Sequence, residues 1–330
     1  MKVVYFQRKP SSSYYSIERV FNDIRSSLDE NIRWKVYVCR FYSKGIIRRF
    51  VDCCVAAFHQ GDVNHITGDV HFLSFFLSKK RTILTIHDCV SLGRSSGIKY
   101  WIYWFFWYWL PIKRSSVVTV ISESTKNELL FHMRDQNLQV EVVHDCVSSQ
   151  FVFMPHQFNQ KEPRILHIGT KQNKNLERVI EALNDVTCLL VIVGSLTKEQ
   201  SFLLSKYCVK FLNLKNLTFE EMITQYNLCD IVMFPSLYEG FGLPILEGQA
   251  VGRPVITSNI LSMPEVGGDG VCYVNPHDAN EIKNAVLKIL NNESFCNEIV
   301  KLGLLNVQNF SSAHISKRYS QIYNKIFDKF

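Results

Sequence analysis

The chain lacks any C-x-x-C pair, although ten of its 330 residues are cysteines. Several of them, including Cys39, Cys188 and Cys229, lie inside apolar runs, where a thiol behaves as a small hydrophobic side chain. A signal peptide is missing as well, because Met1-Lys2 leads directly into the apolar segment 3–6. Together these absences predict a protein of the reducing cytoplasm.

Long apolar runs are also absent. No run reaches the roughly 18 residues that a membrane-spanning helix needs, and the sequence has no short repeat and no low-complexity tract. The composition, with 47% apolar and 20% charged residues, is typical of a globular protein with a large core. A length of 330 residues predicts two domains of ordinary size.

Negative charge is scarce in the first half of the chain. Residues 1–150 carry 20 Lys and Arg against 13 Asp and Glu, whereas residues 151–330 carry 17 of each kind. A basic half indicates an anionic partner, such as a membrane surface, a phosphorylated substrate or nucleic acid, and a solvated surface is an equally good interpretation. Because no nucleic-acid-binding motif is recognisable, we expect no nucleic-acid partner.

Short apolar segments alternate with helix-like segments through both halves. The predicted strands are 3–6, 36–39, 63–66, 82–86, 117–121 and 140–143, then 164–168, 188–193, 209–212, 231–234, 254–257 and 271–274. Alternation at this spacing predicts an α/β protein of two doubly wound, Rossmann-like domains with parallel sheets. The polar segment 148–163 is the predicted linker, and two such domains joined once would face each other across a ligand-binding cleft.

The segment 229–252 combines a predicted strand, a glycine-bearing turn and a helix. The strand 231–234 leads into the turn EGFG at 239–242, and the helix that follows contains Glu247. In an open parallel sheet, ligands bind outside the carboxyl ends of the strands, against helix N-termini. Glu247 could accept the hydroxyls of a ribose there, and the two glycines would permit close approach of the backbone. Neither glutamate need bind a ligand. Glu247 could be a favourable acidic residue in the first turns of a helix, and Glu239 could be a solvated charge in a loop.

A similar succession of strand, loop and helix start is predicted at 168–176, which has the sequence IGTKQNKNL. Lys174 lies where the helix begins. It is well placed for a phosphate, because its charge adds to the helix dipole and to the free amides. The G-x-x-x-x-G-K pattern of a Walker loop is absent, and a solvated lysine is the alternative.

The segment 234–256, whose two glutamates are eight residues apart, resembles the signature of family-four retaining glycosyltransferases of the GT-B fold. Segments 168–183 and 262–270 are similar to the phosphate-lysine segment and the next motif of that family. In the first half, TIHD at 85–88 resembles the active-site histidine segment. The similarity is specific over 164–275 and thinner elsewhere.

The resemblance implies roles for individual residues. His87 and Glu239 would be catalytic, and both would lie beside the transferred sugar. A structural role is the alternative for His87, and the adjoining Asp88 favours the functional role. Lys174 would bind the donor diphosphate and Glu247 the ribose. The implied donor-binding residues are Gly169, Lys174, Gly240, Phe241, Gly242, Leu243 and Glu247.

The sequence departs from the family pattern at three places. Asn173 stands where many members have arginine, and Lys171 is a candidate for the second positive charge. The first loop has Lys9-Pro10-Ser11-Ser12-Ser13 instead of glycines, so Ser12 and Ser13 are candidate contacts for an acceptor or a phosphate. The segment 144–147 is HDCV where the family often has Pro-Asn-Gly-Val. These departures leave the acceptor side undefined.

The segment 100–110, YWIYWFFWYWL, is aromatic all round and is flanked by Lys99 and by Lys113-Arg114. Aromatic side chains with flanking bases suit the interface of an anionic bilayer. Core packing is the alternative, and one face must belong to the core. We expect the other face to contact a membrane surface.

The resemblance implies transfer of a hexosyl unit (mannosyl, glucosyl or similar) from a nucleotide-diphosphate sugar to a glycan or lipid-linked acceptor, in surface polysaccharide synthesis. No D-x-D pair occurs, so we expect neither a metal nor another cofactor. A lysine and helix N-termini would stabilise the charge of the leaving diphosphate instead.

Three parts are expected: an acceptor-side domain at 1–155, a nucleotide-sugar-binding domain at 156–310, and a helix at 311–330 that packs back on the first domain. The expected location is the cytoplasm, at the inner face of the cell membrane. Two alternatives remain open. One is a non-catalytic GT-B subunit that binds a partner glycosyltransferase, and the other is a nucleotide-sugar epimerase of the same fold.

Overall fold

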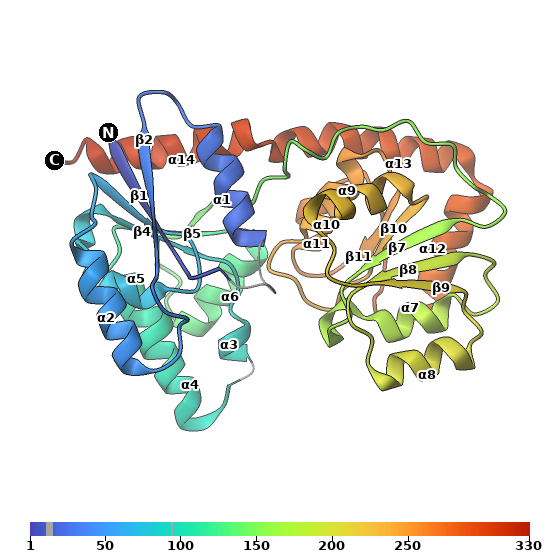
Figure 1. Cartoon of the computed structure of the whole chain (residues 1–330), viewed down its shortest axis with the longest axis horizontal. Helices are drawn as coiled ribbons and strands as arrows, with labels where there is room; N and C mark the ends of the chain where they lie inside the picture. The colour runs from blue at the N-terminus through green and yellow to red at the C-terminus, as the bar shows by residue number, and fades with distance from the viewer. Residues whose placement is uncertain (11–15, 94) are drawn as a thin grey trace. The chain divides into compact units, whose positions relative to one another are not determined.

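A computed structural model describes residues 1–10, 16–93 and 95–330, which form two compact units (Figure 1). The first unit comprises Met1–Cys146 and Ser312–Phe330, and the second comprises Val147–Ser311. Each unit has one six-stranded sheet whose described strand pairs are all parallel. The predicted fold class of two doubly wound α/β units is thereby confirmed.

The sheet of the first unit has the strand order β2-β1-β3-β4-β5-β6. Its strands are β1 (Lys2–Gln7), β2 (Arg33–Val38), β3 (Val63–Ile66), β4 (Thr82–Ile86), β5 (Val117–Val120) and β6 (Glu141–Val142). The inner strands are buried on both faces, which explains their nearly continuous apolar sequences. The chain leaves β1 for β2 on one side and returns to β3 on the other, so the loops after β1 and β3 diverge and leave a crevice.

Helices cover both faces of this sheet. On one face, the main core packs against α2 (Ile46–Ala57), the π-helical segment η3 (Trp104–Trp109) and α6 (Glu123–Met133). On the other face lie α1 (Ser16–Ser26) and α14 (Ser312–Phe327), which contact each other. The remaining helical elements of this unit are η1 (His71–Phe75), η2 (Lys79–Arg81), α3 (Val90–Gly93), α4 (Gly97–Tyr103) and α5 (Leu110–Lys113).

A buried chain of hydrogen bonds attaches α14 to the first sheet. The hydroxyl of Tyr323 lies 2.9 Å from that of Tyr5 and 2.8 Å from Nδ1 of His65. The other nitrogen of His65 lies 2.7 Å from the hydroxyl of Thr85, which is 2.7 Å from that of Thr119. Hydrogen bonds between buried polar groups fix a single register. The last helix therefore belongs to the first unit, although it follows the second in the sequence.

The second unit has the strand order β12-β11-β10-β7-β8-β9. Its strands are β7 (Arg164–Ile168), β8 (Leu189–Val193), β9 (Phe211–Leu214), β10 (Ile231–Phe234), β11 (Val255–Ser258) and β12 (Cys272–Val274). From β7 the chain moves to β8 on one side, and from β10 it moves to β11 on the other. The strand order of this Rossmann-type sheet therefore reverses between β7 and β10.

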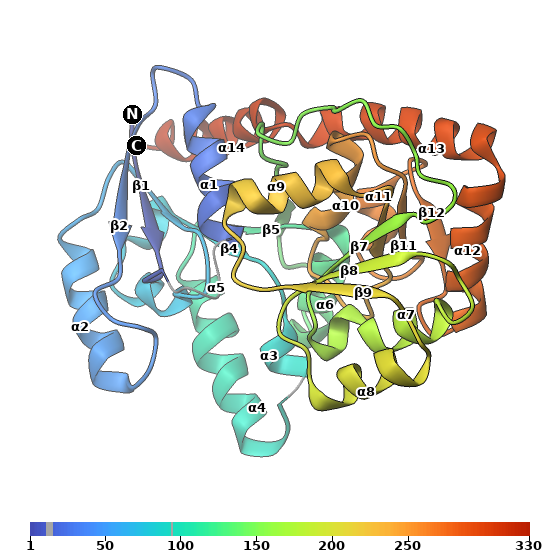
Figure 2. The ribbon, with the colours of Figure 1, turned by 45° about the vertical axis from the view of Figure 1, so that its right-hand side comes forward.

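Two helical layers enclose the second sheet (Figure 2). The main core packs against α7 (Leu176–Ala182), α8 (Lys198–Lys206) and α12 (Ala279–Asn291). The opposite layer contains α9 (Phe219–Leu228), α10 (Leu243–Ala250) and α13 (Glu293–Asn306). The short elements of this unit are η4 (Gln172–Lys174), α11 (Met263–Gly267) and η5 (Val307–Phe310).

All six strands predicted in each half are present, with ends shifted by at most three residues. Helix α9 was not predicted, although Thr218 and Glu221 form a capping box, a recognisable start signal for a helix. The predicted linker 148–163 contains no helix or strand. No helix among residues 1–10, 16–93 and 95–330 is long and apolar enough to cross a membrane.

Candidate active site

The loops after β7 and β10 form the candidate site of the second unit. These strands are neighbours in the sheet, but their following connections run to opposite sides. Ligands of doubly wound sheets bind at such a reversal, outside the carboxyl ends of the strands. The two sequence segments that suggested a ligand site, 168–176 and 234–247, both begin there.

The loop after β7 places Lys174 against the end of the sheet. Gly169 has a φ of +93°, and a Cβ added there would lie 2.8 Å from Cγ of Lys174. The Lys174 side chain therefore lies along the bare glycine backbone. Its ammonium group is 4.7 Å from the centre of the Phe234 ring, at the end of β10. Gly169 is thus needed both for its backbone conformation and for the position of the lysine.

Lys174 and Glu239 form an ion pair, with 2.7 Å between Nζ and Oε1. Their side chains are 20% and 15% exposed, so the pair is largely shielded from water. Asn173 strengthens this connection: its amide donates to the carbonyl of Tyr238 at 3.0 Å and to Glu239 at 3.3 Å. The residue that departs from the family pattern therefore ties the two loops together, and it does so without a positive charge.

The turn 239–242 is shaped by Gly242, which has a φ of +121° and precedes α10. A side chain at this φ would be strained, and its Cβ would lie 3.1 Å from Cδ1 of Ile245. Ser262 holds the turn from the next loop, donating to the carbonyls of Phe241 at 2.7 Å and Glu239 at 3.0 Å. Phe241 is buried, so what it can offer a ligand is its backbone.

Glu247 lies half-buried on α10 and accepts a hydrogen bond from the hydroxyl of Tyr226 on α9. Burial is the main cause that raises the pKa of Tyr226 well above its usual value, and the neighbouring Glu247 raises it further. The hydroxyl therefore stays protonated and donates to the carboxylate. Tyr226 itself packs edge-on against Phe151 of the linker. Tyr226 was not among the predicted site residues, because no helix was predicted at 219–228.

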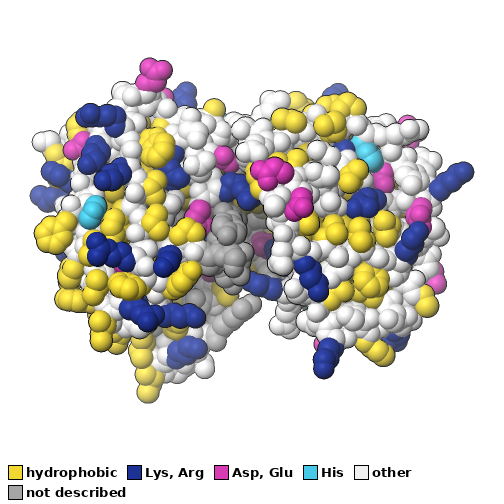
Figure 3. Space-filling view, viewed as in Figure 1, with side chains coloured by type: hydrophobic (Ala, Val, Ile, Leu, Met, Phe, Trp, Pro, Cys, Tyr) yellow, Lys and Arg dark blue, Asp and Glu magenta, His cyan; other side chains and the backbone are white. Residues whose placement is uncertain are grey.

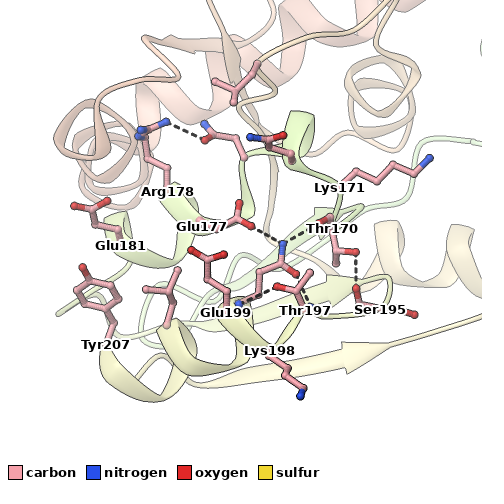
Figure 4. A pocket seen from close by; sticks show the side chains of 15 residues that line it. Thr170, Lys171, Glu177, Arg178, Glu181, Ser195, Thr197, Lys198, Glu199 and Tyr207 are labelled. Carbon is pink, nitrogen blue, oxygen red and sulfur yellow. Dashed lines mark hydrogen bonds between the residues drawn. The ribbon is translucent and has the colours of Figure 1, made fainter. Parts of the chain in front are cut away.

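A polar cavity of about 960 Å³ lies between α7 and α8 (Figure 4). It is lined by Thr170, Lys171 and Arg178 among others, and the Thr170 hydroxyl donates to the carbonyl of Ser195 at 2.7 Å. Of the predicted site residues, its described lining includes Lys171 but neither Lys174 nor Glu239. Thr170, Ser195 and Leu237 of its lining belong to the loops after β7, β8 and β10, so the cavity adjoins the candidate site at the strand ends.

His87 lies in the first unit, at the end of β4, and its side chain is only 8% exposed. Its Nε2 donates to the carbonyl of Thr67 at 2.8 Å, and its Nδ1 is 4.0 Å from the carboxylate of Asp145. Burial raises the pKa of Asp145, whereas the neighbouring His87 lowers it. The adjoining Asp88, which suggested a functional role, instead accepts from the amide of Val90 and shapes a local turn.

Ser12 and Ser13 lie outside the described residues. The first unit has a separate cavity of about 710 Å³ at the ends of β1 and β3, lined by Arg8, Lys9, Lys44 and Arg48 among others. Within the described parts of the chain, no group of three or more His, Cys, Asp or Glu side chains could hold a metal ion.

Residues 149–303 match the protein family described as "Glycosyl transferases group 1". This range contains the whole candidate site of the second unit. The second unit belongs to the group 1 glycosyltransferases. Over 164 residues, 50% of the chain, the sequence is 33% identical to the serotype-specific mannosyltransferase WbdA of Escherichia coli. The aligned part is 18% of that protein, so the chain spans less than a fifth of this relative's length.

Solved structures match both units. Sucrose-phosphate synthase from Thermosynechococcus elongatus has a TM-score of 0.80 at 15% identity, with 100% of each chain covered. Anabaena HepE, in complex with UDP and glucose, has a TM-score of 0.78 at 15% identity, covering 98% of this chain and 100% of that one. At such low identity these similarities show the fold, which is GT-B, and not the substrate.

The glycosyltransferase unit brings together the predicted residues of two separate sequence segments. Lys174 and Glu239 are in contact, and Glu247 is positioned by Tyr226. His87 and the basic cavity belong to the other unit. The roles assigned to individual residues, including His87 and Lys171, stay predictions, as does the cleft expected between the domains.

Proposed function

We propose that the chain is a retaining, metal-independent glycosyltransferase that transfers a hexosyl unit, mannosyl or glucosyl, from a nucleotide-diphosphate sugar. The observation that carries this proposal is the meeting of Lys174, Glu239 and the start of α10 at the strand-order reversal of a group 1 unit. The relative WbdA is named a mannosyltransferase, and HepE was solved with UDP and glucose, which supports a hexose donor with a nucleoside diphosphate.

Lys174 and the turn before α10 would carry the charge of the leaving group. Breaking the bond between sugar and nucleotide develops negative charge on the diphosphate. Lys174 would leave Glu239 for the diphosphate, which would also accept from the amides of Gly242 and Leu243. Preorganised donors of this kind stabilise developing charge strongly in a shielded site. They supply the positive charge that a divalent cation would otherwise provide.

The two glutamates would then have separate tasks. Glu239, released from Lys174, would place its negative charge beside the sugar, whose anomeric carbon becomes positive as the bond breaks. Glu247 would accept the hydroxyls of the ribose. Tyr226 holds one carboxylate oxygen of Glu247 and is therefore a positioning residue. His87 would contribute from the first unit, as the family resemblance implies.

The acceptor would be a glycan or a lipid-linked intermediate of surface polysaccharide synthesis, handled at the inner face of the cell membrane. The segment 100–110 supports membrane contact with one face only. Trp101, Ile102 and Phe106 are exposed, whereas Trp104 turns inward and donates its indole N–H to the carbonyl of His132 at 3.0 Å. Core packing and an exposed apolar face are thus both present in this segment.

Calorimetry with the uridine, guanosine and adenosine diphosphate sugars tests the donor assignment. We expect one of these donors to bind, and Glu247→Ala to weaken its binding by at least tenfold. Glu298→Ala, an exposed glutamate on α13 of the same unit, is the matched control and should bind normally. Unchanged affinity in Glu247→Ala would refute the ribose assignment, and absence of binding by all the donors would refute the proposed function.

A transfer assay with the bound donor tests the chemistry. The anomeric configuration of the product should match that of the donor, and EDTA should leave the rate unchanged. Loss of activity in EDTA that returns with a divalent cation would refute metal independence. Donor binding without transfer would favour the non-catalytic subunit, and release of an epimerised sugar would favour the epimerase.

A further inference from the structure

The first unit has an apolar groove that the proposed function does not use. It lies between α2 and the segment α4–η3, with a volume of about 490 Å³, which is within the rough 300–1,000 Å³ range of small-ligand sites. Phe72 and Cys53 form its buried floor, and Phe50 and Phe106 stand exposed at its rim. An apolar groove open to water at its rim is suited to an apolar ligand.

The groove continues onto an exposed apolar helix turn. Ile46 and Ile47, which begin α2, are 83% and 81% exposed. Such large aliphatic side chains side by side in water are unfavourable unless something covers them. Ile46 also lines the groove, so the same ligand could cover both features.

Basic residues flank the groove-lining residues in the sequence. Lys44 lies two residues before Ile46, the first residue of α2, and Arg48 lies two residues after it. Both line the basic cavity together with Lys9. Arg48 is the chain neighbour of Arg49, which lines the groove together with Ile46. In the figure, hydrophobic and basic side chains interleave over the surface of the first unit (Figure 3).

The basic cavity lies where a ligand of this sheet would bind. Lys9 follows β1 and Asp69 follows β3, which are the two strands at which the strand order of the first sheet reverses. Arg8 is already paired with Glu18 at 2.7 Å and Asp69 at 2.5 Å. Lys9, Lys44 and Arg48 outnumber the acidic groups that remain in the cavity lining, so the cavity attracts an anion.

Arg49 connects the two features. Its guanidinium lies 4.4 Å from the centre of the Trp107 ring in the groove, and its Nη2 donates to the carbonyl of Ser43 at 2.8 Å, at the edge of the basic cavity. Its Nε is buried and has no hydrogen-bond partner among the described residues. A guanidinium stacked on an aromatic ring keeps its remaining N–H groups available to an anion.

We propose that this paired site binds a lipid phosphate, with the hydrocarbon chain in the groove and the phosphate on Lys9, Lys44 and Arg48. The inference rests on the proposed function in one respect, because the lipid would be the carrier of the acceptor. It narrows the acceptor from a glycan or lipid-linked molecule to a lipid that carries phosphate next to its chain.

Dodecyl phosphate below its micelle-forming concentration is the probe, and its binding is measured by calorimetry on the full chain. We expect saturable binding, whereas inorganic phosphate and dodecanol should each bind at least tenfold more weakly. Each methylene removed from the probe should weaken binding roughly fourfold. Equal binding of probes with and without the phosphate would refute the paired site.

Substitutions at exposed positions test the apolar groove and the basic cavity separately without changing buried core residues. Phe50→Ser with Phe106→Ser should weaken binding at least tenfold, and Lys44→Gln with Arg48→Gln should also remove most of its salt dependence. Phe202→Ser and Lys301→Gln, exposed residues of the second unit, are the matched controls. Unchanged affinity in either pair, or binding to vesicles without binding to monomeric probe, would overturn the proposal.

Nucleotide-sugar binding is measured in the same variants. The chain could bind the donor normally and transfer the sugar to a soluble glycan without binding dodecyl phosphate. That result would overturn this inference but would not contradict the proposed function. If the chain bound dodecyl phosphate but no nucleotide sugar, the lipid-phosphate site would be supported and the proposed function would be refuted.

Discussion

At the scale of single residues, the candidate site depends on groups that position the predicted ligand-binding residues. Lys174 lies against a glycine, Glu247 is held by a tyrosine, and the turn before α10 is held by Ser262. None of the holding groups needs to touch a donor. Their effect is to keep the charged groups in place before a ligand arrives, which lowers the cost of binding.

Gly169→Ala should displace Lys174. The new Cβ would lie 2.8 Å from Cγ of Lys174, and the φ of +93° is unfavourable for alanine by about 1 kcal/mol. We expect donor affinity to fall about tenfold in calorimetry, with the unit still folded. Gly93→Ala, where the added Cβ comes no closer than 4.0 Å to another group, is the control. Donor affinity equal to that of the unchanged protein would contradict the packing argument.

Tyr226→Phe should weaken donor binding through Glu247. The variant keeps the ring that packs on Phe151 but removes the hydroxyl that holds the carboxylate. We expect a three- to tenfold rise in the donor KM. This is less than the about 1.5–3 kcal/mol of a hydrogen bond to a charged group, because the carboxylate that would bind the ribose is still present. In the double variant with Glu247→Ala, the tyrosine substitution should add nothing further. Additive effects in that cycle would show that Tyr226 acts independently of Glu247.

At the scale of elements, the attachment of α14 to the first sheet depends on a histidine that must stay neutral. His65 is completely buried within the hydrogen-bonded chain of Tyr5, Tyr323 and Thr85. Burial is the main cause that lowers the pKa of His65 to about 3, and the neighbouring His87 and Arg25 lower it further. A protonated His65 would be incompatible with this packing.

The first unit should therefore lose stability in mild acid. The pKa of His65 is about 6.5 in the unfolded chain and about 3 in the folded unit, so below pH 6.5 only the unfolded chain takes up the proton. The free energy of unfolding should fall by up to about 1.4 kcal/mol per pH unit from this residue between pH 6.5 and pH 3. Buried His71, whose pKa burial also lowers, adds to this dependence.

Tryptophan fluorescence can follow this transition, because all five tryptophans lie in the first unit. Urea unfolding at pH 5 and pH 7.5 gives the two free energies. His65→Gln should be less stable at pH 7.5 but should show a smaller difference between the two pH values. His277→Gln, at an exposed position in the second unit, should not change the difference. An unchanged pH difference in His65→Gln would contradict the assignment.

At the scale of the whole molecule, the basic residues and the exposed aromatic residues are concentrated in the same unit. The net charge of +7 comes entirely from residues 1–150, which also contain the segment 100–110. Attraction to an anionic surface and insertion of aromatic side chains would therefore act together. The second unit, residues 147–311, carries the candidate donor site and has 13 Lys and Arg against 16 Asp and Glu.

Binding to anionic vesicles should depend on both contributions. Trp101→Ser with Ile102→Ser should reduce cosedimentation with anionic vesicles at least fivefold, because both side chains are more than half exposed. Raising the salt concentration from 0.05 M to 0.5 M should reduce it further, since surface charges are then screened over a few ångström. Phe202→Ser serves as the control. Sedimentation that neither the double variant nor salt alters would refute membrane contact.

Most of the fold could be predicted from the sequence. All twelve strands follow from short apolar runs bounded by turn residues, and the alternation with helices implies parallel sheets. Gly242 and Pro244 mark the start of α10 for reasons that are local to the backbone. The glutamates of the candidate site were selected from the glycine-bearing turn beside them and from the family resemblance.

Only the tertiary structure shows which side chains meet. The ion pair of Lys174 with Glu239 joins residues 65 positions apart, and the hydrogen bond of Tyr226 to Glu247 joins two helices across 21 positions. The aromatic segment was ambiguous for the same reason, because hydropathy alone cannot tell an inward indole from an outward one. Local backbone preferences and apolar periodicity depend on residues that are neighbours in the sequence. Contacts between loops depend on how the sheet orders its strands, and a single chain's sequence does not state that order.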